Sequence, residues 1–330
     1  MKLLLMMRGA RKLVESSANV RAGERVVIVT DFARASVGKA MAAAAHSCGA
    51  QVSLIAIPPL TFDSEEPPGT VAAAMREADV VFTPMAKSIA HSAAVHRALL
   101  AGARVMSMTD FVDESLMTGG IEADFARLKP LCDHVARLLS QARLIRVSSP
   151  AGTDIQFDVD GREGNSHPCV ISKPGEFSGA INIEANIAPI EGTAEGTIVA
   201  DAAIPNYGVG VLKEPVRYEV QRGMITEIRG GEQANRIKSV MTSANDINVF
   251  NVAQLGLGLN PNCRTMERLQ EAHGYWGTCH FGIGTSENLG GTVRAAMHYD
   301  CHLWNPKVEL DGNVIIDSGD VLVGKEFVTS

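Results

Sequence analysis

Two histidines and an aspartate near the end of the chain have the residue types and spacing of a metal site. His298 and Asp300 are separated by one residue, so both side chains point to the same face of an extended strand. His280 lies one strand and one turn upstream, in a glycine-rich segment. If the two segments pair, two imidazoles and a carboxylate converge, which suits a non-haem Fe(II) centre or a Zn or Mn hydrolytic site. The other interpretation is that His298 caps a strand and Asp300 begins a turn.

The residues far upstream of these candidates alternate between strand and helix patterns. Short apolar, β-branched runs predict buried strands at 25–30, 52–57, 79–83 and 104–108. Helices are predicted between them, at 33–48, 71–77 and 93–101. This alternation predicts an α/β (Rossmann-like) domain with a parallel sheet over residues 1–143. No GxGxxG or Walker loop is present, so nucleotide binding has no support.

From residue 144 onward the pattern changes to strands separated by Gly, Pro and Asn turns. Strands are predicted at 145–147, 154–159, 198–203, 216–220, 224–228 and 308–316, with a hairpin turn at Asp311-Gly312. We therefore predict a β-rich α+β catalytic domain over residues 144–330 that carries the metal ligands. The helical stretch 125–143 joins the two domains, and Pro130 is expected to kink or break it.

Composition narrows the class of protein. The chain has 330 residues, is 46% hydrophobic and carries a net charge of −7 without a basic block, which argues against nucleic-acid binding. The apolar run at 3–7 is too short for a secretory signal, and no stretch approaches the ~18 apolar residues of a membrane span. Six scattered cysteines without a CxxC pair predict a reducing, cytoplasmic environment.

Four segments of the second half occur in an order that resembles a known superfamily. They are 182–189 with Ala194-Glu195-Gly196, 251–261, 277–284 with 289–291, and His298-Tyr299-Asp300. The chain resembles the M29 metallo-aminopeptidases (aminopeptidase T type) and the oxygenase branch of that fold, the 2,5-dihydroxypyridine 5,6-dioxygenases. The resemblance implies a metal-dependent enzyme with a small-molecule substrate, assembled as a homo-oligomer of two or more chains.

The peptidase branch implies two metals held by two glutamates, two histidines and an aspartate. The resemblance places Glu184, His280, His298 and Asp300 on four of these positions. Gln254 stands in place of the second glutamate. Because a neutral amide supplies no charge to offset the repulsion between two cations, a two-metal site is disfavoured. Glu287 occupies the position of the nearby tyrosine and is a candidate for partial compensation and substrate contact.

The dioxygenase branch implies one Fe(II) held by two histidines and one carboxylate. His298 and Asp300 match two of these ligands, while the other histidine falls on Gln254. We therefore predict His280 as the third ligand, with Glu184 beside the triad. Gln254 becomes a candidate substrate contact.

The resemblance also singles out His91-Ser92, which matches a His-Ser or His-Thr pair that faces the metal in the superfamily. His91 is a candidate acid or base, and Ser92 a candidate substrate contact. The alternative is that Ser92 caps a helix and His91 is solvated. The remaining histidines are assigned to surface or packing roles: His46, His96, His134, His167, His273 and His302.

Three functions remain open. The favoured one is Fe(II)-dependent, O2-dependent cleavage of a hydroxylated N-heteroaromatic ring, with His91 as base and Glu184 orienting water or substrate. The second is a metallohydrolase, an aminopeptidase or amidase, that uses one or two Zn, Mn or Co ions, with Glu184 as ligand or base. The missing charge at Gln254 favours the first, and the presence of Glu184 and His280 favours the second. The third is a non-catalytic binding module.

Overall fold

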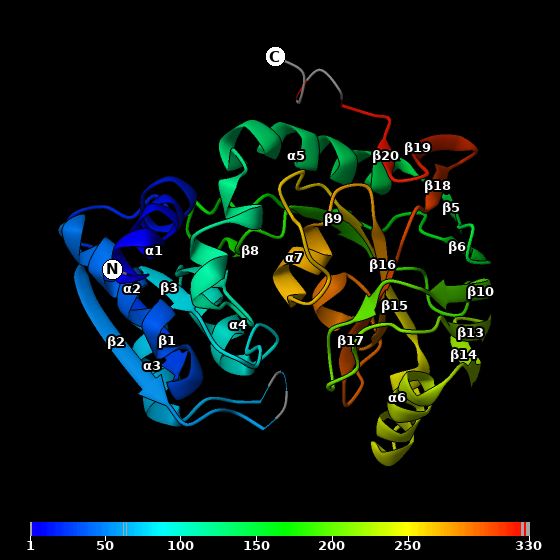
Figure 1. Ribbon diagram of the computed structural model, residues 1–330, viewed down its shortest axis with the longest axis horizontal. Coiled ribbons are helices and arrows are strands. Elements are labelled where there is room, and N and C mark those ends of the chain that lie inside the picture. The colour runs from blue at the N-terminus through cyan, green and yellow to red at the C-terminus, as the bar shows by residue number, and fades with distance from the viewer. Residues whose placement is uncertain (1, 62, 64, 325–326, 328–330) are drawn as a thin grey trace. The chain divides into compact units, whose positions relative to one another are not determined.

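The computed structural model describes residues 2–61, 63, 65–324 and 327, and the chain forms two compact units (Figure 1). The first comprises Met1–Lys129 and His167–Ile183, and the second Pro130–Ser166 and Glu184–Ser330. The predicted boundary between residues 143 and 144 lies inside the second unit, and a later segment returns to the first. Where independently folding domains begin stays a prediction.

The first unit contains the predicted parallel sheet. Its strands are β1 (Arg25–Asp31), β2 (Gln51–Ile57), β3 (Val80–Thr83), β4 (Arg104–Ser107) and β8 (Phe177–Gly179), in the order β2-β1-β3-β4-β8. All four pairings are parallel. Strand β8 was not predicted from the sequence, because its three residues carry no strand pattern.

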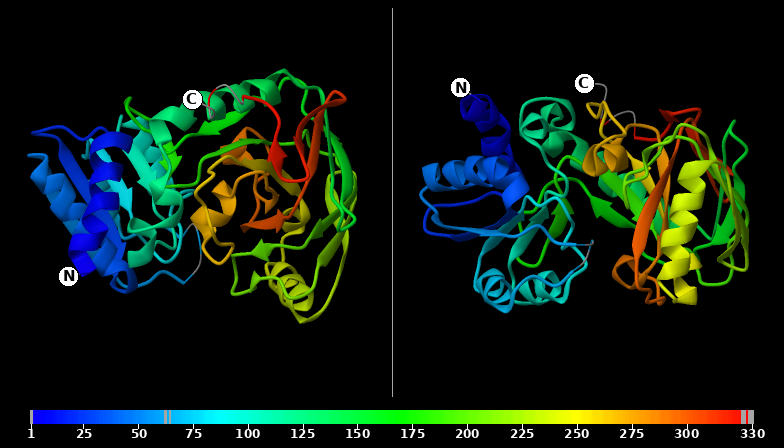
Figure 2. Two further views of the ribbon diagram at one scale, coloured as in Figure 1. Left: turned by 45° about the horizontal axis from the view of Figure 1, so that its top comes forward. Right: turned by 60° about the horizontal axis from the view of Figure 1, so that its bottom comes forward.

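Helices cover both faces of this sheet. On one face lie α1 (Lys2–Arg11), continued by a π-helical turn (Lys12–Ser17), and α2 (Ala35–Ser47), and on the other α3 (Gly69–Arg76) and α4 (Ala93–Leu100) (Figure 2). Val27 and Val29 of β1 pack in one cluster with Val71 and Met75 of α3. Because both faces are covered, β3 and β4 are wholly buried, which explains the apolar residues at their centres, Val80–Phe82 and Val105–Met106. The predicted α/β class is confirmed.

The second unit begins within α5, at Pro130, and continues into a sheet that is exposed on one face. Pro130 lies inside α5 (Phe125–Gln141) and does not end it, so the predicted break is absent. The sheet has the order β14-β13-β10-β6-β5-β18-β19-β20. Its strands are β5 (Leu144–Ser148), β6 (Asp154–Asp158), β10 (Glu195–Ala200), β13 (Val216–Gln221), β14 (Met224–Arg229), β18 (Lys307–Leu310), β19 (Asn313–Asp317) and β20 (Asp320–Val321). The predicted strands of this half overlap them, and alternating burial in β6 and β13 shows one core-facing side.

The predicted hairpin turn is present between β18 and β19. Asp311 and Gly312 both have positive φ, 49° and 82°, as a two-residue turn between antiparallel strands requires.

The second sheet of this unit holds the predicted metal ligands. Its order is β12-β11-β17-β16-β15-β9-β7. The strands are β7 (Asn165–His167), β9 (Glu184–Ile187), β11 (Ala203–Ile204), β12 (Gly210–Val211), β15 (Val252–Gly258), β16 (Cys279–Gly284) and β17 (His298–Leu303). Phe281 of β16 meets Phe157 of β6 edge to face, with ring centroids 6.3 Å apart, so the apolar faces of the two sheets are in contact. The predicted β-rich α+β architecture is confirmed.

The remaining elements are short. Two helices, α6 (Glu232–Ser243) and α7 (Leu269–Gly274), complete the second unit. Turns of 3-10 helix occur at Phe32–Arg34, Asp113–Leu116, Gly119–Glu122, Ile247–Phe250 and Glu287–Leu289. Within the described part of the chain, no helix combines the length and apolar character needed to cross a membrane.

Candidate metal centre

One face of the second sheet carries polar side chains from adjacent strands. Strands β16 and β17 are antiparallel, with His280 opposite His302, Gly282 opposite Asp300 and Gly284 opposite His298. Residues directly opposite each other in such a pair share a face, so these three histidines and Asp300 lie together. The predicted pairing of the two ligand segments is therefore confirmed.

Glycines on this face make room for the imidazole rings. Gly256 of β15 lies opposite His280, and a Cβ there would be 2.2 Å from Cε1 and Nε2 of that ring. A Cβ at Gly282 would be 2.7 Å from Cε1 of His298. Neither contact is possible without displacing the ring or the strand. The repeated glycines of these strands thus mark where rings lie across the backbone.

Asp300 stands at the middle of the polar face. Its Oδ1 lies 3.3 Å from Nε2 of His298, and its Oδ2 lies 3.1 Å from Nε2 of His273. Burial alone would raise the pKa of Asp300, but His273 and His298 hold it well below its usual value. Burial alone would lower the pKa of both histidines, but the charge of Asp300 outweighs it and raises each of them.

The rings of His280 and His302 are buried with unpartnered nitrogens. Among the described residues, neither ring nitrogen of either histidine has a hydrogen-bond partner. Burial, reinforced by the charge of His273, holds the pKa of His280 well below its usual value and lowers the pKa of His302 to about 3, so both rings are neutral at pH 7. Neutral imidazole is the form that binds a metal, and a buried polar atom left unpaired costs about 1–3 kcal/mol. The nitrogens of His280, which belongs to the one compact group of possible ligands among the described residues, show that a metal ion fits the cluster.

His273 joins this cluster from α7. One ligand atom each from His273, His280 and Asp300 lie within 4.8 Å of one another, the one such group of His, Cys, Asp and Glu in the described part of the chain. His273 was assigned to a surface or packing role, and its side chain is 13% exposed and meets Asp300, so it lies within the polar cluster. Its position in a six-residue helix gave no periodic signal that it faces the sheet.

Glu184 and Gln254 adjoin the cluster. Oε1 of Glu184 accepts hydrogen bonds from Nδ2 of Asn186 at 2.7 Å and from Nε2 of Gln254 at 3.2 Å. Oε2 of Glu184 lies 4.0 Å from Nε2 of His280. The donor side of Gln254 is therefore engaged with a carboxylate of the protein, and its contact with substrate stays a prediction.

A contact between Nδ1 and the backbone fixes the orientation of the His298 ring. Its Nδ1 lies 2.9 Å from the carbonyl oxygen of Thr285. A proton donated from Nδ1 to that oxygen leaves Nε2 as the metal-binding atom, on the side of Asp300.

Two other predicted site residues, Ser92 and Glu287, contact neighbouring residues of the protein, and a third, His91, directly precedes Ser92. Oγ of Ser92 accepts a hydrogen bond from Val95 N at 3.3 Å and caps α4, as the alternative interpretation expected. His91 precedes it in the first unit. Glu287 is half-exposed and lies 4.0 Å from Nε of Arg294. The catalytic role of His91 and the substrate contacts of Ser92 and Glu287 stay predictions.

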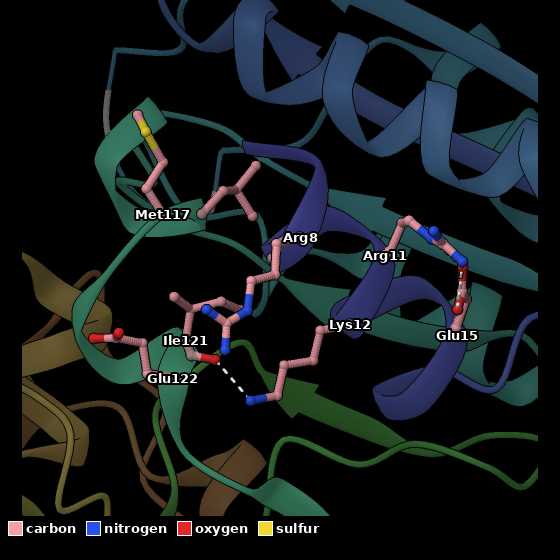
Figure 3. Close-up of a pocket in the computed structure, with 9 residues that line it drawn as sticks. Arg8, Arg11, Lys12, Glu15, Met117, Ile121 and Glu122 are labelled. Carbon is pink, nitrogen blue, oxygen red and sulfur yellow. Dashed lines mark hydrogen bonds and ion pairs between the residues drawn. The ribbon is translucent and has the colours of Figure 1, made fainter. Parts of the chain in front are cut away.

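A separate pocket of about 330 Å³ lies in the first unit (Figure 3). Basic groups that line it are engaged with the protein: Lys12 donates to the carbonyl of Ile121 at 2.8 Å, and Arg11 pairs with Glu15 at 2.7 Å. None of the predicted site residues lines this pocket, so it adds no second candidate for the chemistry.

Sequence comparisons relate the chain to known proteins. Residues 10–323 match the family described as 2,5-dihydroxypyridine 5,6-dioxygenase. The 2,5-dihydroxypyridine 5,6-dioxygenase of Pseudomonas putida is 28% identical over 221 residues, which cover 61% of this chain and 62% of that protein. The matched part thus spans less than two thirds of the length of this curated relative.

Solved structures share the fold. The 2,5-dihydroxypyridine dioxygenase from Pseudomonas putida superposes with a TM-score of 0.83 at 22% identity, over 98% of each chain. Wild-type AmpT from Thermus thermophilus superposes with a TM-score of 0.74 at 13% identity, over 97% of this chain and 99% of that one. The resemblance to the 2,5-dihydroxypyridine 5,6-dioxygenases is confirmed, and the fold is shared with AmpT.

Proposed function

This chain belongs to the 2,5-dihydroxypyridine 5,6-dioxygenase family, and from that premise we propose that it is a metal-dependent enzyme that opens a hydroxylated N-heteroaromatic ring with O2. One observation carries the proposal. His280, His298 and Asp300 lie on one buried face, and among the described residues both ring nitrogens of His280 lack a hydrogen-bond partner.

The ligand types suit a divalent metal, and we propose Fe(II). His280, His298 and Asp300 would hold it, because two imidazoles and a carboxylate leave coordination positions open. When bound, Fe(II) supplies the redox chemistry with O2 and a Lewis acid for the ring oxygens.

Glu184 and His91 are the proposed acid–base groups. Two amides hold Oε1 of Glu184, while Oε2 lies on the side of His280. This arrangement orients Oε2 to accept a hydrogen bond from a water or from a substrate hydroxyl. His91 is proposed to deprotonate the ring hydroxyl, a role that His91→Gln tests through the pH profile of turnover.

The substrate is proposed from the named relative. 2,5-dihydroxypyridine is the first compound to test, because the curated protein that is 28% identical is named for acting on it. The resemblance further supports a homo-oligomer of two or more chains.

The decisive experiment measures O2 consumption with protein purified and loaded with Fe(II) under anaerobic conditions. We expect one O2 consumed per 2,5-dihydroxypyridine lost, and no consumption by His298→Ala. Protein loaded with Zn or Mn that hydrolyses a peptide or amide without O2 would overturn the oxygenase proposal. Iron-loaded protein that leaves both the ring and O2 unchanged would contradict it as well.

A further inference from the structure

We infer that His273 is a further metal ligand, grouped with His280 and Asp300, while His298 remains a ligand beside the other oxygen of Asp300. This inference rests on the proposed function, because it concerns the same metal. It adds a ligand from a helix to a set that the sequence predicted from strands alone.

The first support is that α7 is anchored over the polar face. The N–H of Asn260, a fully buried residue, donates to the carbonyl of Gly274 at 2.8 Å. Oε2 of Glu271 accepts the N–H groups of Arg264 at 2.8 Å and of Thr265 at 3.2 Å. A Cβ at Gly258 of β15 would lie 2.1 Å from the carbonyl oxygen of Tyr275, so the end of α7 sits directly on the strand. His273 is therefore held in place by the backbone that carries it.

The second support is the geometry of the ligand atoms. Two ligands that each lie about 2.1 Å from one ion, at angles near 90–110°, are separated by ~3.0–3.5 Å. Nε2 of His273 and Oδ2 of Asp300 are 3.1 Å apart. The rings of His273 and His280 lie with centroids 4.6 Å apart, at 36° to each other. These three residues are the group whose ligand atoms fit within 4.8 Å.

His302 provides a matched comparison within the same cluster. Its ring stacks on His273 at 26° with centroids 5.2 Å apart, and both of its ring nitrogens lack partners among the described residues. It is not part of the ligand group. Removing His302 therefore disturbs the same packing without removing a proposed ligand.

The test is an anaerobic titration of the full-length, metal-free chain with Co(II), followed by isothermal calorimetry and the visible spectrum. We compare wild type with His273→Ala, His273→Gln and His302→Ala, each checked for folding by thermal unfolding without metal. Removing a ligand is expected to raise the Kd for Co(II) by at least about 100-fold, beyond the ~10–100-fold that groups merely orienting a ligand cost. We expect this loss and an altered spectrum in both His273 variants, and a change below about tenfold in His302→Ala.

His273→Gln separates a ligand from a positioning group. The amide can still donate a hydrogen bond to Asp300, so it preserves an orienting role but supplies no imidazole nitrogen. Kd and spectrum close to wild type in His273→Gln would overturn the inference, as would an equal loss in His302→Ala. If wild type itself binds no Co(II), the proposed function fails; if wild type binds while the His273 variants bind equally well, only the inference fails.

Discussion

The two faces of strands β15, β16 and β17 are built from alternate residues of the same segments, yet their chemistry is opposite. Both are buried. One face presents Leu255, Phe281 and Tyr299 to the neighbouring sheet, and the other presents His280 and Asp300. The comparison shows that burial alone does not identify the core of this unit. Only one of the two faces stabilises the fold by excluding water.

The energetic consequences differ accordingly. Burying a large apolar side chain stabilises by about 1.5–3 kcal/mol, whereas each unpaired buried polar atom costs about 1–3 kcal/mol. Burial of the apolar face thus offsets the free-energy cost of the unpaired polar atoms on the other face. A metal ion removes this cost for the atoms that bind it. Substitutions on the apolar face should therefore mainly lower the stability of the fold, whereas substitutions on the polar face should mainly weaken metal binding.

The largest expected effect is on the polar face, from Asp300→Asn. The change removes the one charge that meets both His273 and His298. Breaking such a buried charged contact costs about 3–5 kcal/mol, or ~10²–10⁴-fold in metal affinity, and ring cleavage should fall below detection. Metal content after purification and O2 consumption measure this. One metal per chain retained in Asp300→Asn would contradict the proposed centre.

The counterpart on the apolar face is Phe281→Ala. Removing the ring that packs on Phe157 should lower the free energy of unfolding by about 3–5 kcal/mol. Urea denaturation of the metal-free protein measures the loss, with Phe157→Ala as the matched variant. The Kd for metal should change far less than in Asp300→Asn. A stably folded Phe281→Ala protein that has lost its metal would break the distinction between the faces.

Metal binding should raise the free energy of unfolding only through residues of the polar face. Saturation at 100 times Kd is expected to raise the free energy of unfolding by about 2.7 kcal/mol, because the ion binds only the folded chain. The gain should persist in Phe281→Ala and vanish in His280→Ala. Thermal unfolding with and without Co(II) measures it, and an equal gain in His280→Ala would show that the ion binds elsewhere.

The smallest expected effect is that of Gly256→Ala. Its Cβ would lie 2.2 Å from the His280 ring, so the ring must turn, at a cost of about 1–3 kcal/mol and with weaker metal binding. Gly69→Ala, which meets nothing within 4 Å, is the control and should not lose stability. Adding His280→Ala to Gly256→Ala should recover part of the stability. If Gly256→Ala behaves like Gly69→Ala, the proposed space-making role of the glycine is wrong.

The sequence was sufficient for features that depend on neighbouring residues. The spacing of His298 and Asp300 predicted a shared face, and the apolar runs predicted the parallel sheet, because strand period and burial are local properties. Asp311-Gly312 predicted its hairpin for the same reason. The fifth strand, β8, was missed because it is recruited by pairing with β4 and not by its own composition.

The candidate site was predicted in part. Pairing of β16 with β17 followed from the pattern, but the proximity of His273 to Asp300 depends on where a short helix packs, which no spacing encodes. Glu287 was taken from a family position, and it lies 4.0 Å from Nε of Arg294, so its contact with substrate stays a prediction. Tertiary packing therefore decides which of the several histidines meet the carboxylate.

The interlocking of Gly256 with His280 also constrains how this chain can change over generations. An alanine at position 256 is harmful while the His280 ring is present, because the two would overlap. For the same reason, a ring cannot be placed at position 280 while residue 256 has a side chain. A lineage that first loses His280 can afterwards replace Gly256 by a larger residue. If Gly256 is replaced first, the intermediate protein is impaired. Such one-way steps would make the histidine difficult to regain once lost, so descendants of a common ancestor would settle into different ligand sets without returning.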